Sequence, residues 1–398
     1  MEKLSAGKKK AWRGLELILL ESTISQVVIS MPIMVLFYNS IGMNQAQIAL
    51  SQALFTVAMV VLGVPMGWVA DRFSRKWCNV VGNFGSAVGF LVYAMAQNFY
   101  HVVAAEILLG VFMSFTQGVD AALTKSYASR IDRTGKLFAQ RWALMATWGL
   151  AAGGLGYLVG GWIGGMSFRL AIGASALTMA AGGVLALFLH DSGRKLKSTY
   201  RNPLQDMARV AKVCLARPRL RWWMMAMAVA EGITRVMVFP MTLLLLVAGV
   251  PVGWLGVAWV MNSLAALIGT RIAGWSLGRV QQEWMVFAIP IAVVTVSLAG
   301  MSLSLNLVSV WLFAGLGLAR GWTSALIPAI VQQNAPEAMG ATAMSLAKNI
   351  SRILYIPTVY VVGWACDFSV AWAMMATIAI FVPLAVVVGW KIRGFEKR

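Results

Sequence analysis

Long apolar runs alternate with short polar breaks along the entire chain, and this pattern predicts membrane-spanning helices. About 20 consecutive apolar residues are enough for a helix to cross the hydrocarbon core of a bilayer. Twelve runs reach that length, and the expected helices cover residues 14–38, 47–70, 77–97, 101–124, 140–164, 168–190, 222–247, 252–276, 283–303, 306–330, 340–365 and 369–391. We therefore expect an all-α integral membrane protein.

Composition supports the same class. Of the 398 residues, 60% are hydrophobic and only 12% are charged, whereas soluble domains carry about 25% charged residues. The mean hydropathy is +0.75. After twelve spans, the remaining residues are too few for a soluble domain of ordinary size. An integral membrane protein is the class that fits.

The positive charges are distributed very unevenly between alternate connections. Of the 33 Lys and Arg residues, 27 fall on or at the edge of the termini and every second loop, and Arg169 alone falls at the edge of the opposite side. Basic loops remain on the cytoplasmic side of a membrane. We therefore expect a multi-pass protein of the cytoplasmic membrane with both termini in the cytoplasm. The net charge of +19 then reflects topology and attraction to anionic lipid, not binding to nucleic acid.

Cofactor and enzyme signatures are missing from the sequence. The three cysteines, Cys78, Cys214 and Cys366, show no metal-binding or disulfide spacing. Patterns of membrane proteases, esterases and nucleotide-driven pumps do not occur either. We expect no enzymatic activity, no cofactor and no metal. The expected partners are a small-molecule substrate, protons and the lipid bilayer, and the protein is expected to act as a monomer.

A polar, basic segment at 191–221 divides the chain into two related halves. The expected domains are a six-helix bundle at 1–190, the cytoplasmic linker, and a second six-helix bundle at 222–398. Two short patterns of the first half recur in the second half in the same helix order. Gly67-Trp68 corresponds to Gly274-Trp275, and Gln117-Gly118 corresponds to Arg320-Gly321. Parallel repeats of this kind are typical of transporters whose binding site lies at the membrane midplane between the halves.

The turn after the second expected helix carries a recognisable motif. The pattern Gly67-x-x-x-Asp71-Arg72-x-x-Arg75-Lys76 resembles motif A of the major facilitator superfamily, with Ser74 where the family usually has glycine. This resemblance implies a fold of two pseudo-symmetric six-helix bundles. It also implies that Gly67 lets the expected helices 47–70 and 340–365 approach closely and that Asp71 faces a helix N-terminus. The gating residues expected from it are Gly67, Asp71, Arg72, Arg75 and Asp120, with Arg75 paired to Asp120. The alternative is that the basic residues are only topology signals.

Two further patterns bear on the direction of transport. Gly156-Tyr157-x-x-Gly160-Gly161 resembles motif C of drug–proton antiporters, with Tyr157 where proline is typical. Tight helix packing without any antiport function is the alternative, because small residues at spacings of four let helices approach closely in lipid. Ser114 stands where antiporters of this family commonly carry an arginine.

Three acidic residues within the expected spans are candidates for carrying protons: Glu21, Glu106 and Glu231. Charges inside a bilayer are costly and usually face a partner or a cavity. Glu21 has no cation at helical spacing, so burial favours its protonated form. Glu231 and Arg235 are four residues apart, which also allows a purely structural ion pair. Glu21 is therefore the first candidate.

The expected substrate-binding residues are Gln26, Arg235, Asn262 and Arg320, which are polar or charged side chains within apolar runs. Arg320 has no acid nearby on its own helix, so its partner is either an acid across the cavity or an anionic substrate. Lys348 and Arg352 are interpreted as gating or snorkelling residues.

These observations predict a secondary transporter that works by alternating access. Our leading interpretation is proton-coupled efflux of a small amphipathic organic compound, such as a drug, a metallophore or a metabolite. Proton-coupled import of an organic anion is the alternative, favoured by Arg235 and Arg320. A non-transporting membrane receptor is the third possibility, and motif A argues against it.

Overall fold

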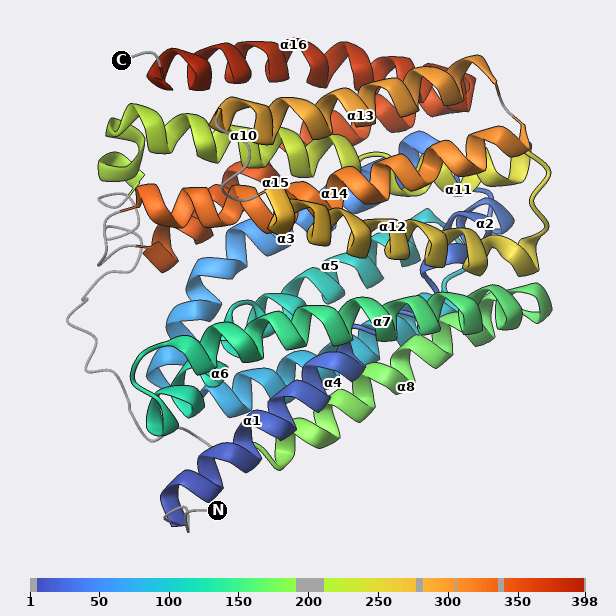
Figure 1. Cartoon of the computed structure of the whole chain (residues 1–398). Coiled ribbons are helices and arrows are strands. Elements are labelled where there is room, and N and C mark those ends of the chain that lie inside the picture. The colour runs from blue at the N-terminus through green and yellow to red at the C-terminus, as the bar shows by residue number, and fades with distance from the viewer. Residues whose placement is uncertain (1–5, 191–210, 277–281, 305, 336–339, 397–398) are drawn as a thin grey trace. The chain divides into compact units, whose positions relative to one another are not determined.

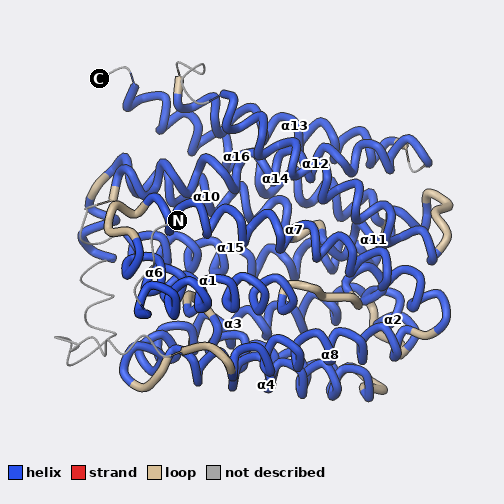
Figure 2. Tube along the Cα trace, turned by 60° about the horizontal axis from the view of Figure 1, so that its bottom comes forward, coloured by secondary structure: helices blue, strands red, loops and turns tan. Residues whose placement is uncertain are grey.

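The computed structural model describes residues 6–190, 211–276, 282–304, 306–335 and 340–396. Among these residues, nearly all are helical and none forms a strand (Figure 2). The helices of the first half are α1 (Ala6–Ser25), η1 (Met31–Ile33), α2 (Met34–Ser40), α3 (Gln45–Arg72), α4 (Arg75–Met95), α5 (Phe99–Thr116), α6 (Val119–Ile131), α7 (Lys136–Met166) and α8 (Phe168–Leu187). Those of the second half are α10 (Pro218–Arg235), α11 (Val238–Val247), η2 (Val252–Trp254), α12 (Leu255–Ser276), α13 (Glu283–Leu303), α14 (Leu307–Asn334), α15 (Gly340–Phe368) and α16 (Val370–Glu396).

The all-α membrane fold is confirmed, because helices fall on all twelve predicted stretches. Ten helical stretches among the described residues are long and apolar enough to cross a membrane. The other two predicted spans contain α1 and α15, and both helices carry charged residues within their apolar runs. Three consecutive lysines begin α1, and α15 carries Lys348 and Arg352.

Three predicted helices are broken within the span. The first has non-helical backbone at 26–30, just before Pro32, whose ring nitrogen has no hydrogen to donate. The fourth breaks at Gly118, which adopts a left-handed φ of +79° that glycine tolerates without strain. The seventh breaks between α10 and α11. The predicted end of the fourth helix at residue 124 is wrong, because α6 continues to Ile131 as a polar extension that apolar runs cannot reveal.

The described chain divides into two compact units. Unit 1 comprises Met1–Ile33 and Val57–Pro203, and unit 2 comprises Met34–Thr56 and Leu204–Arg398. The segment at 34–56, which holds α2 and the first part of α3, therefore groups with the C-terminal helices. The domain boundaries expected from the sequence place that segment in the first bundle.

Within unit 1, α4 lies along both α5 and α8, and α1 packs against α6 and α8 (Figure 1). Apolar side chains from these helices form a buried core that includes Leu15, Ile18, Leu123 and Tyr127. Side-chain caps begin several of the helices. Asn98 and Ser167 accept hydrogen bonds from the first-turn amides of α5 and α8, which satisfies donors that a helix leaves open.

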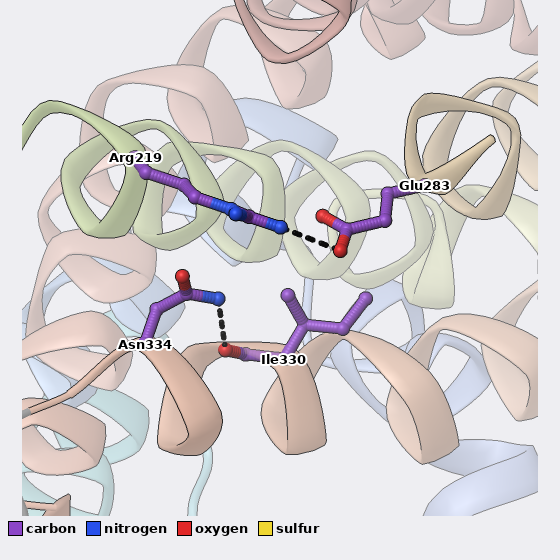
Figure 3. Close-up of polar contacts among 4 residues, drawn as sticks. All are labelled: Arg219, Glu283, Ile330 and Asn334. Carbon is purple, nitrogen blue, oxygen red and sulfur yellow. Dashed lines mark hydrogen bonds and ion pairs between the residues drawn. The ribbon is translucent and has the colours of Figure 1, made fainter. Parts of the chain in front are cut away.

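Within unit 2, α12 and α14 pack backbone to backbone. A Cβ added at Gly321 would lie 1.9 Å from the carbonyl oxygen of Ala266, so only glycine permits this approach. Arg219 at the start of α10 and Glu283 at the start of α13 form an ion pair at 2.5 Å (Figure 3). Nearby, Asn334 donates to the carbonyl of Ile330 at 2.9 Å and closes the end of α14. The ion pair thus ties the start of α10 to the start of α13, whereas the Asn334 contact lies within α14.

Orientation in the membrane is a prediction that rests on the charge distribution. A cysteine introduced as Ser198→Cys in the basic segment should react with a membrane-impermeant maleimide only from the cytoplasmic side. Ser304→Cys is the matched control. Ser304 follows the C-terminal end of α13, on the side expected to face outward, so this cysteine should react only from outside. The native cysteines are all buried, so background labelling should be low. Labelling of Ser198→Cys in intact cells would contradict both the orientation and the span count.

Candidate functional site

A buried carboxylate on α1 forms the centre of the candidate site in unit 1. The side chain of Glu21 is 1% exposed, although its helix enters from a basic N-terminus. Its oxygens accept hydrogen bonds from Asn83 at 2.7 Å, from Asn79 at 3.1 Å and from Ser25 at 3.1 Å. Among the described residues all its partners are neutral, so nothing there compensates a negative charge on Glu21.

The amide groups around Glu21 come from one face of α4. Asn79 and Asn83 lie one turn apart, and both are buried. Asn83 also donates to the side-chain oxygen of Asn79 at 2.8 Å, which fixes the two amides against each other. Buried polar groups of this kind need hydrogen-bond partners, and the carboxyl of Glu21 supplies them.

A second carboxylate shares this network. The amide nitrogen of Asn79 also donates to Asp120 at 3.3 Å, so one amide bridges acids from α1 and α6. The two carboxylates interact electrostatically, and two negative charges this close in an apolar bundle disfavour each other. Binding one proton would relieve that repulsion. We name Glu21, Asn79, Asn83 and Asp120 the carboxylate–amide cluster.

Motif A residues are only partly described. Ser74, the departure from the family pattern, caps α4 by accepting from the amide of Trp77 at 3.2 Å. Arg72 is exposed, and the side chain of Asp71 lies outside the described residues. A Cβ built at Gly67 meets no heavy atom within 4 Å.

Asp120 does not stand where the sequence placed it. Because α6 restarts after Gly118, Asp120 lies in the first turn of α6 and not at the end of a helix. Among the described residues, Asn79 and not Arg75 is its partner. The Arg75 guanidinium donates to the carbonyl of Ala122 at 3.5 Å. Among the described residues, Arg75 thus contacts a backbone carbonyl of α6, and the ion pair expected between Arg75 and Asp120 is not found there.

Glu106, another proton-carrying candidate, lies on α5 and is buried. The hydroxyl of Tyr93 on α4 donates to it at 2.5 Å. Tyr93 is not among the described residues that donate hydrogen bonds to Glu21, which are Asn79, Asn83 and Ser25.

Gln26 lies in the break after α1, opposite the glycine-rich face of α7. Its amide donates to Ser22 at 3.2 Å, and the residue is exposed. A Cβ added at Gly149 would lie 2.3 Å from the Gln26 side chain, and one at Gly160 would lie 1.8 Å from the carbonyl oxygen of Ile29. The glycines of α7 therefore make room for the irregular backbone that carries Gln26.

In unit 2, the spacing of Glu231 and Arg235 does not produce an ion pair among the described residues. The Arg235 guanidinium instead lies over the ring of Tyr355 on α15, 4.4 Å from its centroid. Glu231 remains within electrostatic range of Arg235, Lys348 and Arg352. A cation–π contact between α10 and α15 thus replaces the helical pair that the spacing suggested.

Asn262 and Arg320 line one small pocket in unit 2. The other lining residues are Thr234, Met237, Val238, Met241, Trp259, Phe313 and Leu316. Asn262 also donates to the carbonyl of Phe313 at 2.9 Å, which ties α12 to α14. Methionine and aromatic walls with one cation suit an amphipathic ligand.

Asn79 and Asn83 are the residues that the sequence analysis missed. They form an i, i+4 pair of amides within an apolar run, which is the same signal that identified Glu21. Their role depends on the packing of α4 beside α1 and α6, which belongs to the tertiary structure and cannot be read from the sequence pattern.

Two related halves of membrane helices with a buried acid in the first bundle define the class of secondary transporters. The sequence model of the Major Facilitator Superfamily matches residues 22–356. The chain belongs to this superfamily of membrane transporters, and the predicted family and fold are confirmed. It is a transporter and not an enzyme.

Individual relatives are distant. An uncharacterised MFS-type transporter of Methanocaldococcus jannaschii is 26% identical over 99 residues, which are 25% of this chain and 26% of that protein. The match thus spans about a quarter of that relative's length.

Solved structures agree in fold. A bacterial homologue of the human lysosomal transporter Spinster, crystallised in an inward-facing, unoccupied conformation, superposes with a TM-score of 0.75 at 14% identity over 99% of this chain and 98% of that one. A variant of the nucleoside transporter NupG gives a TM-score of 0.72 at 15% identity over 97% and 98%. At such identities the likeness concerns the fold alone.

Proposed function

We propose that this protein is a proton-coupled secondary transporter of the cytoplasmic membrane that exports a small amphipathic organic compound. Proton entry would drive export of a drug, a metallophore or a metabolite by exchange. The observation that carries the proposal is the burial of Glu21 among neutral donors, without a cation among the described residues.

Proton coupling requires a group that is stable both with and without its proton. The carboxylate–amide cluster meets that requirement in two ways. Amide and hydroxyl donors stabilise the ionised form of Glu21, while burial and the neighbouring Asp120 favour the protonated form. A change in water access during alternating access would shift this balance and release the proton. Glu106 and Glu231 remain secondary candidates for the same role.

The remaining candidate residues receive supporting roles in this proposal. Gln26 and the pocket that holds Asn262 and Arg320 would contact the substrate, since these side chains offer polar groups beside apolar walls. The motif A residues Gly67, Asp71, Arg72 and Arg75, together with Asp120, would control closure on the cytoplasmic side. Asp120 would then link gating to protonation, because Asn79 joins it to Glu21.

A second candidate function is proton-coupled import of an organic anion. The surplus of cations near Glu231 favours it. Import by symport and export by exchange use the same proton site and differ in the order of binding.

Transport into proteoliposomes tests the proposal and separates the two candidates. Vesicles are incubated with an extract of small metabolites under an imposed pH gradient, and the accumulated solutes are identified by mass spectrometry. An acidic interior should drive uptake if the protein exchanges solute for protons, and an acidic exterior should drive it if both move together. Accumulation that is identical with and without a gradient would contradict proton coupling.

A further inference from the structure

Among the described residues, three cations and one carboxylate are gathered where α10 packs against α15 in unit 2. Arg235 on α10 and Lys348 and Arg352 on α15 all lie within electrostatic range of Glu231. One carboxylate cannot neutralise three cations, so the group retains positive charge.

The contacts inside this group leave donor capacity unused. Arg235 stacks on the ring of Tyr355, and it repels Arg352. The Nη1 atom of Arg352 is buried and has no hydrogen-bond partner among the described residues. Buried donors in proteins are nearly always paired, and leaving a charged one unpaired costs more than leaving a neutral one. The arrangement is therefore incomplete without a further acceptor.

The exposure of these charged side chains indicates that the missing hydrogen-bond acceptor reaches them from an aqueous space and not from the lipid. Glu231 and Lys348 are exposed although they lie within helices of a membrane bundle. A charge facing the hydrocarbon would cost about 2.5–3.5 kcal/mol even on a lenient scale. These side chains therefore face an aqueous space that a solute could enter.

We infer that Arg235, Lys348 and Arg352 bind an oxyanion group, a carboxylate or a phosphate, on the transported solute. Guanidinium groups match the geometry of such anions and form charge-assisted hydrogen bonds with them. This assigns to Lys348 and Arg352 a binding role in place of the gating or snorkelling role expected from the sequence. In the absence of solute, Glu231 occupies part of the site as an internal competitor. The inference rests on the proposed transport function and narrows its substrate to an organic anion.

Inorganic phosphate serves as the probe, because it is the smallest oxyanion that the site should accept. The purified protein in phosphatidylcholine nanodiscs is unfolded thermally at rising phosphate and constant ionic strength. The midpoint temperature of unfolding of the wild type should rise with phosphate concentration until it reaches a plateau. Arg352→Gln and Lys348→Gln should each weaken phosphate binding by about tenfold, as expected for loss of a charge-assisted hydrogen bond. Glu231→Gln should bind phosphate more tightly, because it removes the competing carboxylate.

Lys212→Gln is the control, since it removes one exposed cation elsewhere in unit 2 and should leave phosphate binding unchanged. A wild type without a phosphate-dependent shift would overturn the inference, and so would equal losses in Lys212→Gln and Arg352→Gln. Repeating the titration with phosphatidylglycerol in the nanodisc separates a solute from a lipid headgroup. Loss of the phosphate effect there would assign the site to lipid and overturn the inference.

Failure of this inference can be told apart from failure of the proposed function. Phosphate binding is measured without a pH gradient, so it does not depend on proton-driven transport. Phosphate binding in a protein that shows no proton-driven transport would contradict the proposed function but not the inference. Proton-driven transport in a protein that binds no phosphate would sink only the inference.

Discussion

Glu21→Gln should abolish solute accumulation driven by a pH gradient while leaving substrate binding measurable. The glutamine mimics a permanently protonated carboxyl, because its one carbonyl oxygen can still accept from Asn83 while its amide has no proton to release. By reciprocity, proton and substrate change each other's affinity by the same factor. In the wild type, affinity for the solute identified by mass spectrometry should therefore change by roughly fivefold or more with pH, and in the mutant it should be constant.

The sign of that pH dependence distinguishes exchange from symport. If proton and substrate compete, wild-type affinity rises with pH, and the mutant keeps the weak affinity of the protonated form at every pH. If the proton must bind first, affinity falls as pH rises, and the mutant keeps the strong affinity. Glu16→Gln is the matched control, because Glu16 lies on the same helix but is exposed and pairs with Arg141 at 2.9 Å. A Glu21→Gln variant that retains the full pH dependence would direct attention to Glu106.

Gly160→Ala should strongly destabilise the N-terminal unit. The added Cβ would lie 1.8 Å from the carbonyl oxygen of Ile29, and backbone cannot move aside as a flexible side chain can. Overpacking a well-packed site typically lowers the free energy of unfolding by about 1–3 kcal/mol. A clash with backbone should lower it by an amount at or above the upper end of that range. Thermal unfolding followed by tryptophan fluorescence should show a clearly lowered midpoint.

Gly153→Ala is the control for that experiment. It lies on the same helix, but its nearest neighbour, the carbonyl oxygen of Gln26, is 3.8 Å from the added Cβ. Since alanine favours a helix over glycine by about 1 kcal/mol, this variant should be as stable as the wild type or slightly more stable. Equal destabilisation of both variants would contradict the packing account. A Gly160→Ala protein that is stable but leaks protons would favour the antiporter interpretation of motif C.

The helices and the buried acid Glu21 could both be predicted from the sequence, because both are defined by long apolar runs. Lipid demands continuous apolar runs, so twelve helices are visible as runs, and Glu21 is visible as a charge within one of them. The breaks at 26–30 and at Gly118 were not predicted, because each lies within a stretch whose overall apolar character predicts one continuous helix. The helical extension to Ile131 was missed for the opposite reason, since its polar residues look like a loop.

Side-chain partners depended on neighbours far apart in sequence. The spacing of Glu231 and Arg235 suggested a helical ion pair, but Tyr355 from α15 takes the guanidinium. Asp120 was expected to meet Arg75, yet among the described residues its partner is Asn79, one turn further along the same helix α4. Local spacing indicates which residues can interact along one helix, whereas packing against another helix decides which of them do.

Infrared difference spectroscopy on the purified protein tests the coupling role of Glu21 most directly, because it requires no known substrate. An ordinary glutamate is ionised throughout the range from about pH 5.5 to about pH 8.5. A protonated carboxyl band that disappears as pH rises through this range, and that is missing in Glu21→Gln but present in Glu16→Gln, is the result predicted here. Spectra that show the same band in the wild type and in Glu21→Gln, or no such band in the wild type, would contradict the role of Glu21 as the coupling acid.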